Sequence, residues 1–277
     1  MVAKSPTVLK RKINWVTTIA IIVFHLIALL VSPFCFSWAN FTAFFVLYVI
    51  TGLGITLGFH RYFTHNAFET KNPIVISILA IAGSLALQGN ITSWVTDHFQ
   101  HHNYSDLEGD PHSSKEGFYW SHLGWLFYEI DLNQQQIKLR DKMLKDPLIR
   151  FWDQMLIFVG VQVLTGLILL AIGGWSMVIW GIFLRVVFVW HVTWFINSAC
   201  HYWGFVTYPD SGDNSKNLWW MGLLAFGEGW HNNHHKFQSS PRHGLEWWQI
   251  DVTWYIIKTL SILKLAKYNP KLVPNNK

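Results

Sequence analysis

Four long apolar stretches limit the possible folds of this chain more than any other feature. They cover residues 14–33, 38–58, 154–173 and 175–197. Each is long enough, or nearly so, to cross the hydrocarbon core of a bilayer as a helix. Charged residues make up only 13% of the 277 residues, about half the share usual in soluble domains. The sequence therefore predicts an all-α membrane protein with four transmembrane helices.

The charges predict the orientation of these helices. The connectors between the first and second stretches and between the third and fourth are short and uncharged, so nearly all charged residues lie on one side with both termini. Lys10, Arg11 and Lys12 stand directly before the first stretch, and basic flanks mark the cytoplasmic side. No convincing small-residue cleavage site follows the first stretch, so we interpret it as an uncleaved anchor. Arg185, inside the fourth stretch, is expected to face a polar cavity or a neighbouring helix.

Residues 59–153 and 198–277 are predicted to form a cytoplasmic helical cap in a single domain spanning residues 1–277. If the apolar run 74–89 crossed the membrane, the histidine clusters would lie on opposite sides. We therefore expect it to be a helix packed in the cap or lying at the interface. Residues 247–266 are expected to form an amphipathic helix on the membrane surface, with Trp247, Trp248 and Trp254 at headgroup level. An ordinary cap helix is the alternative.

Three histidine clusters lie between the apolar stretches, all on the predicted cytoplasmic side. The second and third have the pattern HxxHH, which places three imidazoles on one face of a helical turn, where we expect them to converge on a single centre. His60 and His65 are five residues apart, so they need a helix end or a bend to point together. The clusters are His60/His65, His98/His101/His102 and His231/His234/His235.

The number of imidazoles predicts more than one metal ion. A catalytic zinc takes three protein ligands and a structural zinc takes four, so eight or more imply two metals or redundant ligands. His201 is a ninth candidate at the end of the fourth stretch, with Asn197 one helical turn earlier on the same face. Asp97 and Glu228 could accept hydrogen bonds from ligand N–H groups, or be surface acids. The histidines expected to be structural or substrate-adjacent are His25, His112, His122, His191 and His243.

The motifs HRYFTH, HFQHH and HNNHH resemble those of the membrane fatty-acid desaturases. The resemblance extends to residues 58–65, 110–125, 194–201 and 227–235, and is strongest to the Δ9 subgroup of animal stearoyl-CoA and cyanobacterial acyl-lipid desaturases. It covers about residues 13–265. It implies that nine histidines hold two Fe(2+) ions and that Asn197 contacts one iron through water. The implied ligands are His60, His65, His98, His101, His102, His201, His231, His234 and His235.

The resemblance also implies the reaction. O2 and two external electrons remove two hydrogens from a saturated acyl chain, leaving a cis double bond and water. An unactivated methylene gives acid–base chemistry nothing to act on, which agrees with an oxidising metal centre. In the family a kinked tunnel sets the position of the double bond. The matching bend residues here are Gln88, Trp94, Thr193 and Trp194.

Departures from the family pattern bear on the acyl carrier. Thr96 and the Glu129–Ile130 pair stand where the acyl-CoA enzymes have basic residues that contact CoA. We therefore expect a C16 or C18 chain esterified in a glycerolipid, with an acyl-CoA substrate as the alternative. The chain has no fused cytochrome b5 signature and only two cysteines. Reduced ferredoxin, or a cytochrome b5-like protein, is therefore the expected electron donor, docking on the basic face.

Two other functions fit parts of the pattern. A membrane hydroxylase also uses eight-histidine motifs but yields an alcohol instead of an alkene. A metal transporter or store would place histidines and acids inside the spans, whereas here the clusters lie beyond the span ends. A nucleic-acid partner is not expected, because no basic stripe recurs after the N-terminal cluster. If the source is cyanobacterial, the expected location is the plasma or thylakoid membrane.

Overall fold

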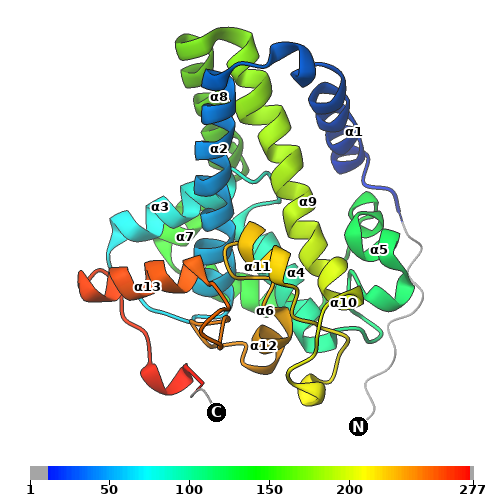
Figure 1. Ribbon diagram of the computed structural model, residues 1–277, viewed down its shortest axis with the longest axis vertical. Coiled ribbons are helices and arrows are strands. Elements are labelled where there is room, and N and C mark those ends of the chain that lie inside the picture. The colour runs from blue at the N-terminus through cyan, green and yellow to red at the C-terminus, as the bar shows by residue number, and fades with distance from the viewer. Residues whose placement is uncertain (1–11, 275–277) are drawn as a thin grey trace.

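The computed structural model describes residues 12–274, and every regular element within that range is helical. Extended pairing among these residues is limited to isolated bridges, such as Ile13 with Tyr128. Figure 1 shows four long helices standing at one end of the molecule and the shorter helices gathered at the other. The long helices are α1 (Trp15–Leu30), α2 (Trp38–Leu53), α8 (Met155–Val178) and α9 (Arg185–Asn197), which continues directly from the π-helix η5 (Ile179–Leu184).

The remaining elements either form the cap or connect the long helices to one another. The α-helices are α3 (Pro73–Ser84), α4 (Ile91–Tyr104), α5 (Phe118–His122), α6 (Gln134–Met143), α7 (Pro147–Trp152), α10 (Ala199–Tyr202), α11 (Trp219–Leu224), α12 (His231–Lys236) and α13 (Val252–Ile262). The π-helices are η2 (Gly54–Thr64) and η5 (Ile179–Leu184). The 3₁₀ turns are η1 (Ser32–Cys35), η3 (Ser114–Glu116), η4 (Gly124–Phe127), η6 (Pro209–Ser211) and η7 (Pro270–Leu272).

Two helical segments are long and apolar enough to cross a membrane. They are Trp38–Thr64, of 27 residues, and Met155–Tyr202, of 48 residues. The second segment is kinked at Gly174, whose φ of 69° and ψ of −166° are not helical, so it consists of two helices that meet at this residue. All four predicted stretches are therefore helical. That all four cross a bilayer stays a prediction, because α1 has only 16 residues.

Arg185 is fully buried between the long helices. Its guanidinium donates hydrogen bonds to the Gly181 carbonyl (3.0 Å), the Thr51 hydroxyl (3.3 Å) and the Gln162 carboxamide (3.4 Å). It also bonds the Leu85 carbonyl in the turn after α3. The expectation that Arg185 faces neighbouring helices is confirmed, and the side chain ties α9 to α2, α8 and the cap.

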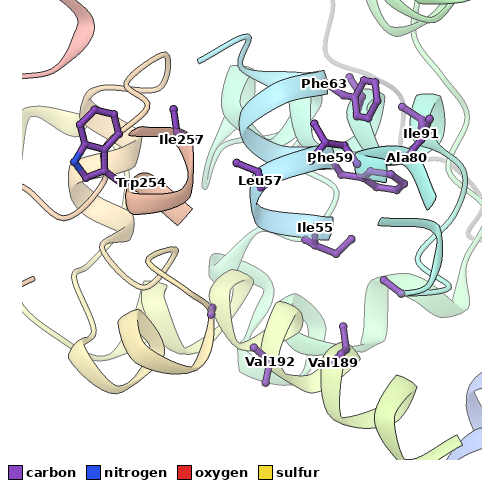
Figure 2. Packing of buried hydrophobic residues seen from close by; sticks show 14 of the residues in the cluster. Ile55, Leu57, Phe59, Phe63, Ala80, Ile91, Val189, Val192, Trp254 and Ile257 are labelled. Carbon is purple, nitrogen blue, oxygen red and sulfur yellow. The ribbon is translucent and has the colours of Figure 1, made fainter. Parts of the chain in front are cut away.

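The hydrophobic core lies around η2. Figure 2 shows side chains of η2 packed toward those of α3, α9 and α13. A Cβ on Gly54 would lie 2.2 Å from the Ala82 carbonyl carbon, so only glycine allows α3 to lie this close to η2. The apolar run 74–89 therefore forms a short helix that packs against η2 and ends at Ser84. Whether its exposed side also lies at the membrane interface stays a prediction.

The helix near the C-terminus is shorter than predicted and faces differently. The Asp251 carboxylate caps α13 by accepting a hydrogen bond from the Trp254 amide at 2.9 Å, and Trp254 packs into the core with 7% of its surface exposed. The prediction that Trp254 lies at headgroup level is therefore wrong. Trp247 is 87% exposed and Trp248 is 42% exposed, so an interfacial position for these two residues stays a prediction.

Candidate metal centre

The fold brings the nine predicted histidines together in two groups. Within each group, one potential ligand atom of every residue lies within 4.8 Å of those of the others. The five-histidine group consists of His60, His65, His98, His102 and His234. The four-histidine group consists of His101, His201, His231 and His235.

Each HxxHH motif contributes to both groups. His98 and His102 on α4 belong to the five-histidine group, whereas His101 belongs to the four-histidine group. On α12 the roles are reversed, because His234 alone joins the five-histidine group. The expectation that one motif converges on one centre is therefore wrong. At about 100° per residue, positions i and i+4 are about 40° apart but i+3 and i+4 are about 100° apart.

A π-helix brings His60 and His65 together. In η2 the His65 amide donates to the His60 carbonyl, five residues earlier, at 3.1 Å. The wider turn stacks residues five apart on one face, and the two imidazole centroids lie 4.7 Å apart. The sequence required a helix end or a bend here, and the wider helix meets the same requirement.

The ring nitrogens have the spacing that a shared metal ion requires. Neighbouring Nε2 atoms in the five-histidine group lie 3.0–3.2 Å apart, and those of His201 and His231 lie 3.1 Å apart. Two nitrogens that bind the same ion at about 2.0–2.1 Å are about 2.8–3.4 Å apart in octahedral or tetrahedral geometry. The Nε2 atoms of His101 and His235 are buried without a hydrogen-bond partner. The donor set therefore fits two metal ions.

Several of these imidazoles are held neutral, as metal ligands must be. Burial and the mutual repulsion of neighbouring imidazoles hold the pKa well below the ordinary 6.5. The residues concerned are His65, His98, His102, His231 and His234.

Carboxylates hold the outer nitrogens of the four-histidine group. The Nδ1 of His101 bonds Asp110 at 3.0 Å, the Nδ1 of His201 bonds Asp106 at 2.9 Å, and the Nδ1 of His235 bonds Asp213. A carboxylate at Nδ1 fixes the tautomer that leaves Nε2 free to bind metal. Burial alone would raise the pKa of each aspartate, but the hydrogen bonds and the nearby histidines hold it well below its usual range.

Glu228 has the same role toward the five-histidine group. Its Oε2 lies 2.8 Å from the Nδ1 of His60 and 3.0 Å from the Nδ1 of His243, and its Oε1 accepts a hydrogen bond from Arg61 at 3.1 Å. Arg61 is fully buried and also pairs with Asp251 at 2.9 Å. The predicted role of Glu228 agrees with these contacts.

Asp97 is placed differently from Glu228. Among residues 12–274 it makes no hydrogen bond to a histidine, and it lines a cavity beside His98. Burial raises the pKa of Asp97 to about 7. A role in orienting a ligand therefore has no contact to support it.

Sequence reasoning missed most of the acids and two histidines near the centre. His112 stacks on His101 with centroids 4.2 Å apart, and His243 lies 4.4 Å from His234. Asp110 and His112 belong to the Asp-Pro-His motif that follows the second cluster, so a signal was present there. Asp213 lies in the polar segment 209–216, where nothing in the local sequence distinguishes it.

Two cavities reach the histidines. The larger, of about 490 Å³, runs between α1, α4 and α9, and the smaller, of about 60 Å³, lies between α2, η2 and α9. Both are lined by Trp94, His98, Thr193 and Asn197. Asn197 thus lies where the cavities meet, at the edge of the histidine groups.

The four predicted bend residues line the larger cavity. Gln88 donates a hydrogen bond to the Thr193 hydroxyl at 3.0 Å and accepts one from the Trp94 indole at 3.2 Å. Gln88 lies in a tight turn between two residues with left-handed backbone, Leu87 with a φ of 52° and Gly89 with a φ of 92°. Trp194 completes the wall. Trp94 and Thr193 also line the smaller cavity, so the three hydrogen-bonded side chains lie where the two cavities adjoin, and we call this group the constriction.

Comparisons with known proteins agree with this geometry. The family model described as fatty acid desaturase matches residues 36–270. The chain is 48% identical to an sn-1 stearoyl-lipid 9-desaturase of Anabaena variabilis, over 93% of this chain and 94% of that protein. It is also 48% identical to a protein of the same name from Synechocystis sp., over 96% of this chain and 84% of that one. A chloroplastic palmitoyl-monogalactosyldiacylglycerol delta-7 desaturase of Arabidopsis thaliana is 44% identical, over 87% of this chain and 65% of that protein.

Proposed function

Because this chain belongs to the fatty acid desaturase family, we propose that it is a Δ9 desaturase with two Fe(2+) ions that acts on a C16 or C18 chain esterified in a glycerolipid. The enzyme is an oxidoreductase of fatty-acid metabolism. The observation that carries the proposal is the meeting of nine imidazoles, in two groups, at the junction of two cavities. O2 is the co-substrate, and the product is a cis-monounsaturated acyl chain.

The proposed ligands are the nine histidines of the two groups, with Asn197 as a contact through water. Bound iron would supply the oxidising power that an unactivated methylene requires. The protein's own part is to keep several of the imidazoles neutral through burial. It also fixes the tautomers of four others through Asp106, Asp110, Asp213 and Glu228. None of these groups needs to exchange a proton with the acyl chain.

The cavities are the proposed acyl channel. A chain entering the larger cavity would pass Gln88 and Trp94, turn at Thr193, and end in the smaller cavity. Asn197 and His98, at the turn, would lie beside the carbons that lose hydrogen. A fixed turn at a fixed distance from the channel mouth selects one pair of carbons, as positioning by a rigid site requires.

The mouth of the larger cavity supports a lipid-borne substrate. Glu129, where the acyl-CoA enzymes have a basic residue, forms an exposed ion pair with Lys12 at 2.9 Å. Ile130 lines the cavity and Thr96 is buried in α4, where its hydroxyl bonds the Ser93 carbonyl. A polyphosphate would find no free cation among these residues.

Further proposals concern the membrane and the electrons. We propose that α1, α2, α8 and α9 all cross the bilayer, with the cap and both termini in the cytoplasm. Many of their large apolar side chains are exposed, such as Val16 at 82% and Leu156 at 81%, and lipid would cover them. Reduced ferredoxin, or a cytochrome b5-like protein, is the proposed electron donor, since among residues 12–274 the only cysteines, Cys35 and Cys200, are free.

The test is expression in a host that lacks desaturases, followed by mass spectrometry of fatty acids in each lipid class. We expect a Δ9 cis-alkene in glycerolipids, absent for His101→Ala although this variant still inserts in membranes. An alcohol would indicate a hydroxylase, and a double bond appearing first in acyl-CoA would refute the glycerolipid substrate. Full activity of His101→Ala would refute the metal assignment.

A further inference from the structure

The two histidine groups differ in the acids that surround them. Three of the four imidazoles in the four-histidine group bond a carboxylate through Nδ1. In the five-histidine group, within the part of the chain that the structure describes, only His60 does. Its partner Glu228 is shared with His243 and pairs with Arg61, whose charge Asp251 also shares, so these three groups leave one net negative charge there. The carboxylates therefore place more negative charge beside one group than beside the other.

The three aspartates are held in place by neutral donors. Asp106 accepts hydrogen bonds from the Ser114 amide and hydroxyl at 3.0 and 2.6 Å and from the Asn214 amide at 2.9 Å. Asp110 accepts from the Asp106 amide at 2.9 Å, and Asp213 from the Ser215 amide at 3.0 Å. Among residues 12–274, no lysine or arginine forms a salt bridge with these three carboxylates.

The backbone at Asp106 supports a functional role for this arrangement. Asp106 has a φ of 57°, in the left-handed region that residues other than glycine adopt infrequently. The conformation turns its amide toward Asp110 and its carboxylate toward His201. One residue thus serves two of the three carboxylate–imidazole pairs.

We propose that Asp106, Asp110 and Asp213 are positioning residues that make the two metal sites unequal. Of a pair holding one ferrous and one ferric ion, the four-histidine group holds the ferric ion. An imidazole that donates to a carboxylate is a stronger metal ligand, and buried negative charge favours the more positive ion. The inference rests on the proposed function, because it requires two irons in these groups.

The experiment uses the full-length chain, purified in detergent and loaded with 57Fe. The reduced protein receives one equivalent of ferricyanide, which takes one electron from the iron pair, and Mössbauer spectra are recorded. We expect one ferric and one ferrous signal, each homogeneous. Asp213→Asn should change only the ferric signal, whereas Glu228→Gln should change only the ferrous one.

The expected change in the one-electron potential of the iron pair follows from the effect of such acids on metal affinity. Removing a carboxylate that accepts a hydrogen bond from a metal-binding imidazole lowers metal affinity about 10- to 100-fold. If this loss falls on the ferric ion, the one-electron potential rises by about 60–120 mV. Asp210→Asn is the matched control, since it removes a carboxylate three residues away that pairs with Lys236 at the surface. Asp106→Asn provides a second variant, should Asp213→Asn fail to fold.

Three results would overturn the inference: ferric iron divided equally between two signals, a ferrous signal altered by Asp213→Asn, or an equal shift in Asp210→Asn. A chain that bound no pair of irons would refute the proposed function itself, and the inference would fall with it. Two irons with identical behaviour would refute the inference alone.

Discussion

The constriction between the two cavities makes a quantitative prediction about the position of the double bond. Thr193→Val preserves the shape of the side chain but removes its hydroxyl. That hydroxyl accepts the hydrogen bond from Gln88 at 3.0 Å and donates to the Val189 carbonyl at 3.0 Å. The substitution leaves Gln88 attached to Trp94 alone, so the constriction loses one of its two bonds.

A neutral hydrogen bond contributes about 1 kcal/mol, which corresponds to about fivefold in an equilibrium at 25 °C. If the constriction selects one pair of carbons over its neighbours, the fraction of product with the double bond at neighbouring positions should rise about fivefold in Thr193→Val. Iron content should not change, because Thr193 is not among the grouped histidines.

The assay is mass spectrometry of derivatised fatty acids from a host without desaturases. Thr165→Val is the control, since the Thr165 hydroxyl donates to the Val161 carbonyl of its own helix at 2.8 Å and Thr165 lines neither of the two cavities. The control should give the wild-type product. A single unshifted isomer from Thr193→Val, at the wild-type rate, would refute the role of the hydroxyl in positioning.

Three further predictions concern chain length, stability and pH. Gly52→Ala should shift products toward shorter chains, because the new Cβ would lie 2.3 Å from the Phe226 ring and narrow the smaller cavity. Excluding one methylene of the acyl chain from an apolar pocket costs about 1–3 kcal/mol of binding, so an unchanged ratio of C16 to C18 products would contradict this prediction. Arg61→Ala should destabilise the fold by about 3–5 kcal/mol, since it leaves two buried carboxylates without their cation; thermal unfolding should show a loss much larger than that of Arg140→Ala, which removes an exposed pair. The metal-free chain should lose stability as the pH falls below about 6.5, because its histidines take up protons when the chain is unfolded, whereas buried imidazoles with a lowered pKa, such as that of His65, stay neutral in the folded chain. An unfolding temperature that is equal at pH 7.5 and 5.5 would count against this prediction.

The sequence, with its resemblance to the family, was sufficient to predict which nine histidines the fold brings together. It did not determine how they divide. The HxxHH pattern places three rings near one face, and the contacts of α4 with distant residues decide the division: His98 meets His65 and His102 meets His234, whereas His101 joins the other group. The spacing of His60 and His65 required a departure from the α-helix, which the structure provides as a π-helix.

The supporting acids were harder to predict because they depend on loops. Asp106 reaches His201 across 95 residues of sequence through a left-handed backbone conformation, and Asp213 lies on a segment without periodicity. Asp97 was a reasonable candidate because it precedes His98, yet adjacent residues on a helix point about 100° apart. Its side chain faces the cavity instead of a ligand. The prediction for Trp254 was wrong for another reason: an amphipathic pattern does not show whether the apolar face of a helix contacts a membrane or a protein core.

The most direct test of the proposed iron pair is the metal content of the purified chain. Elemental analysis of wild type should give two irons per chain, and His102→Ala and His231→Ala, one from each histidine group, should each hold fewer. A single zinc per chain, or two irons retained in full by both variants, would contradict the claim that these imidazoles hold an iron pair.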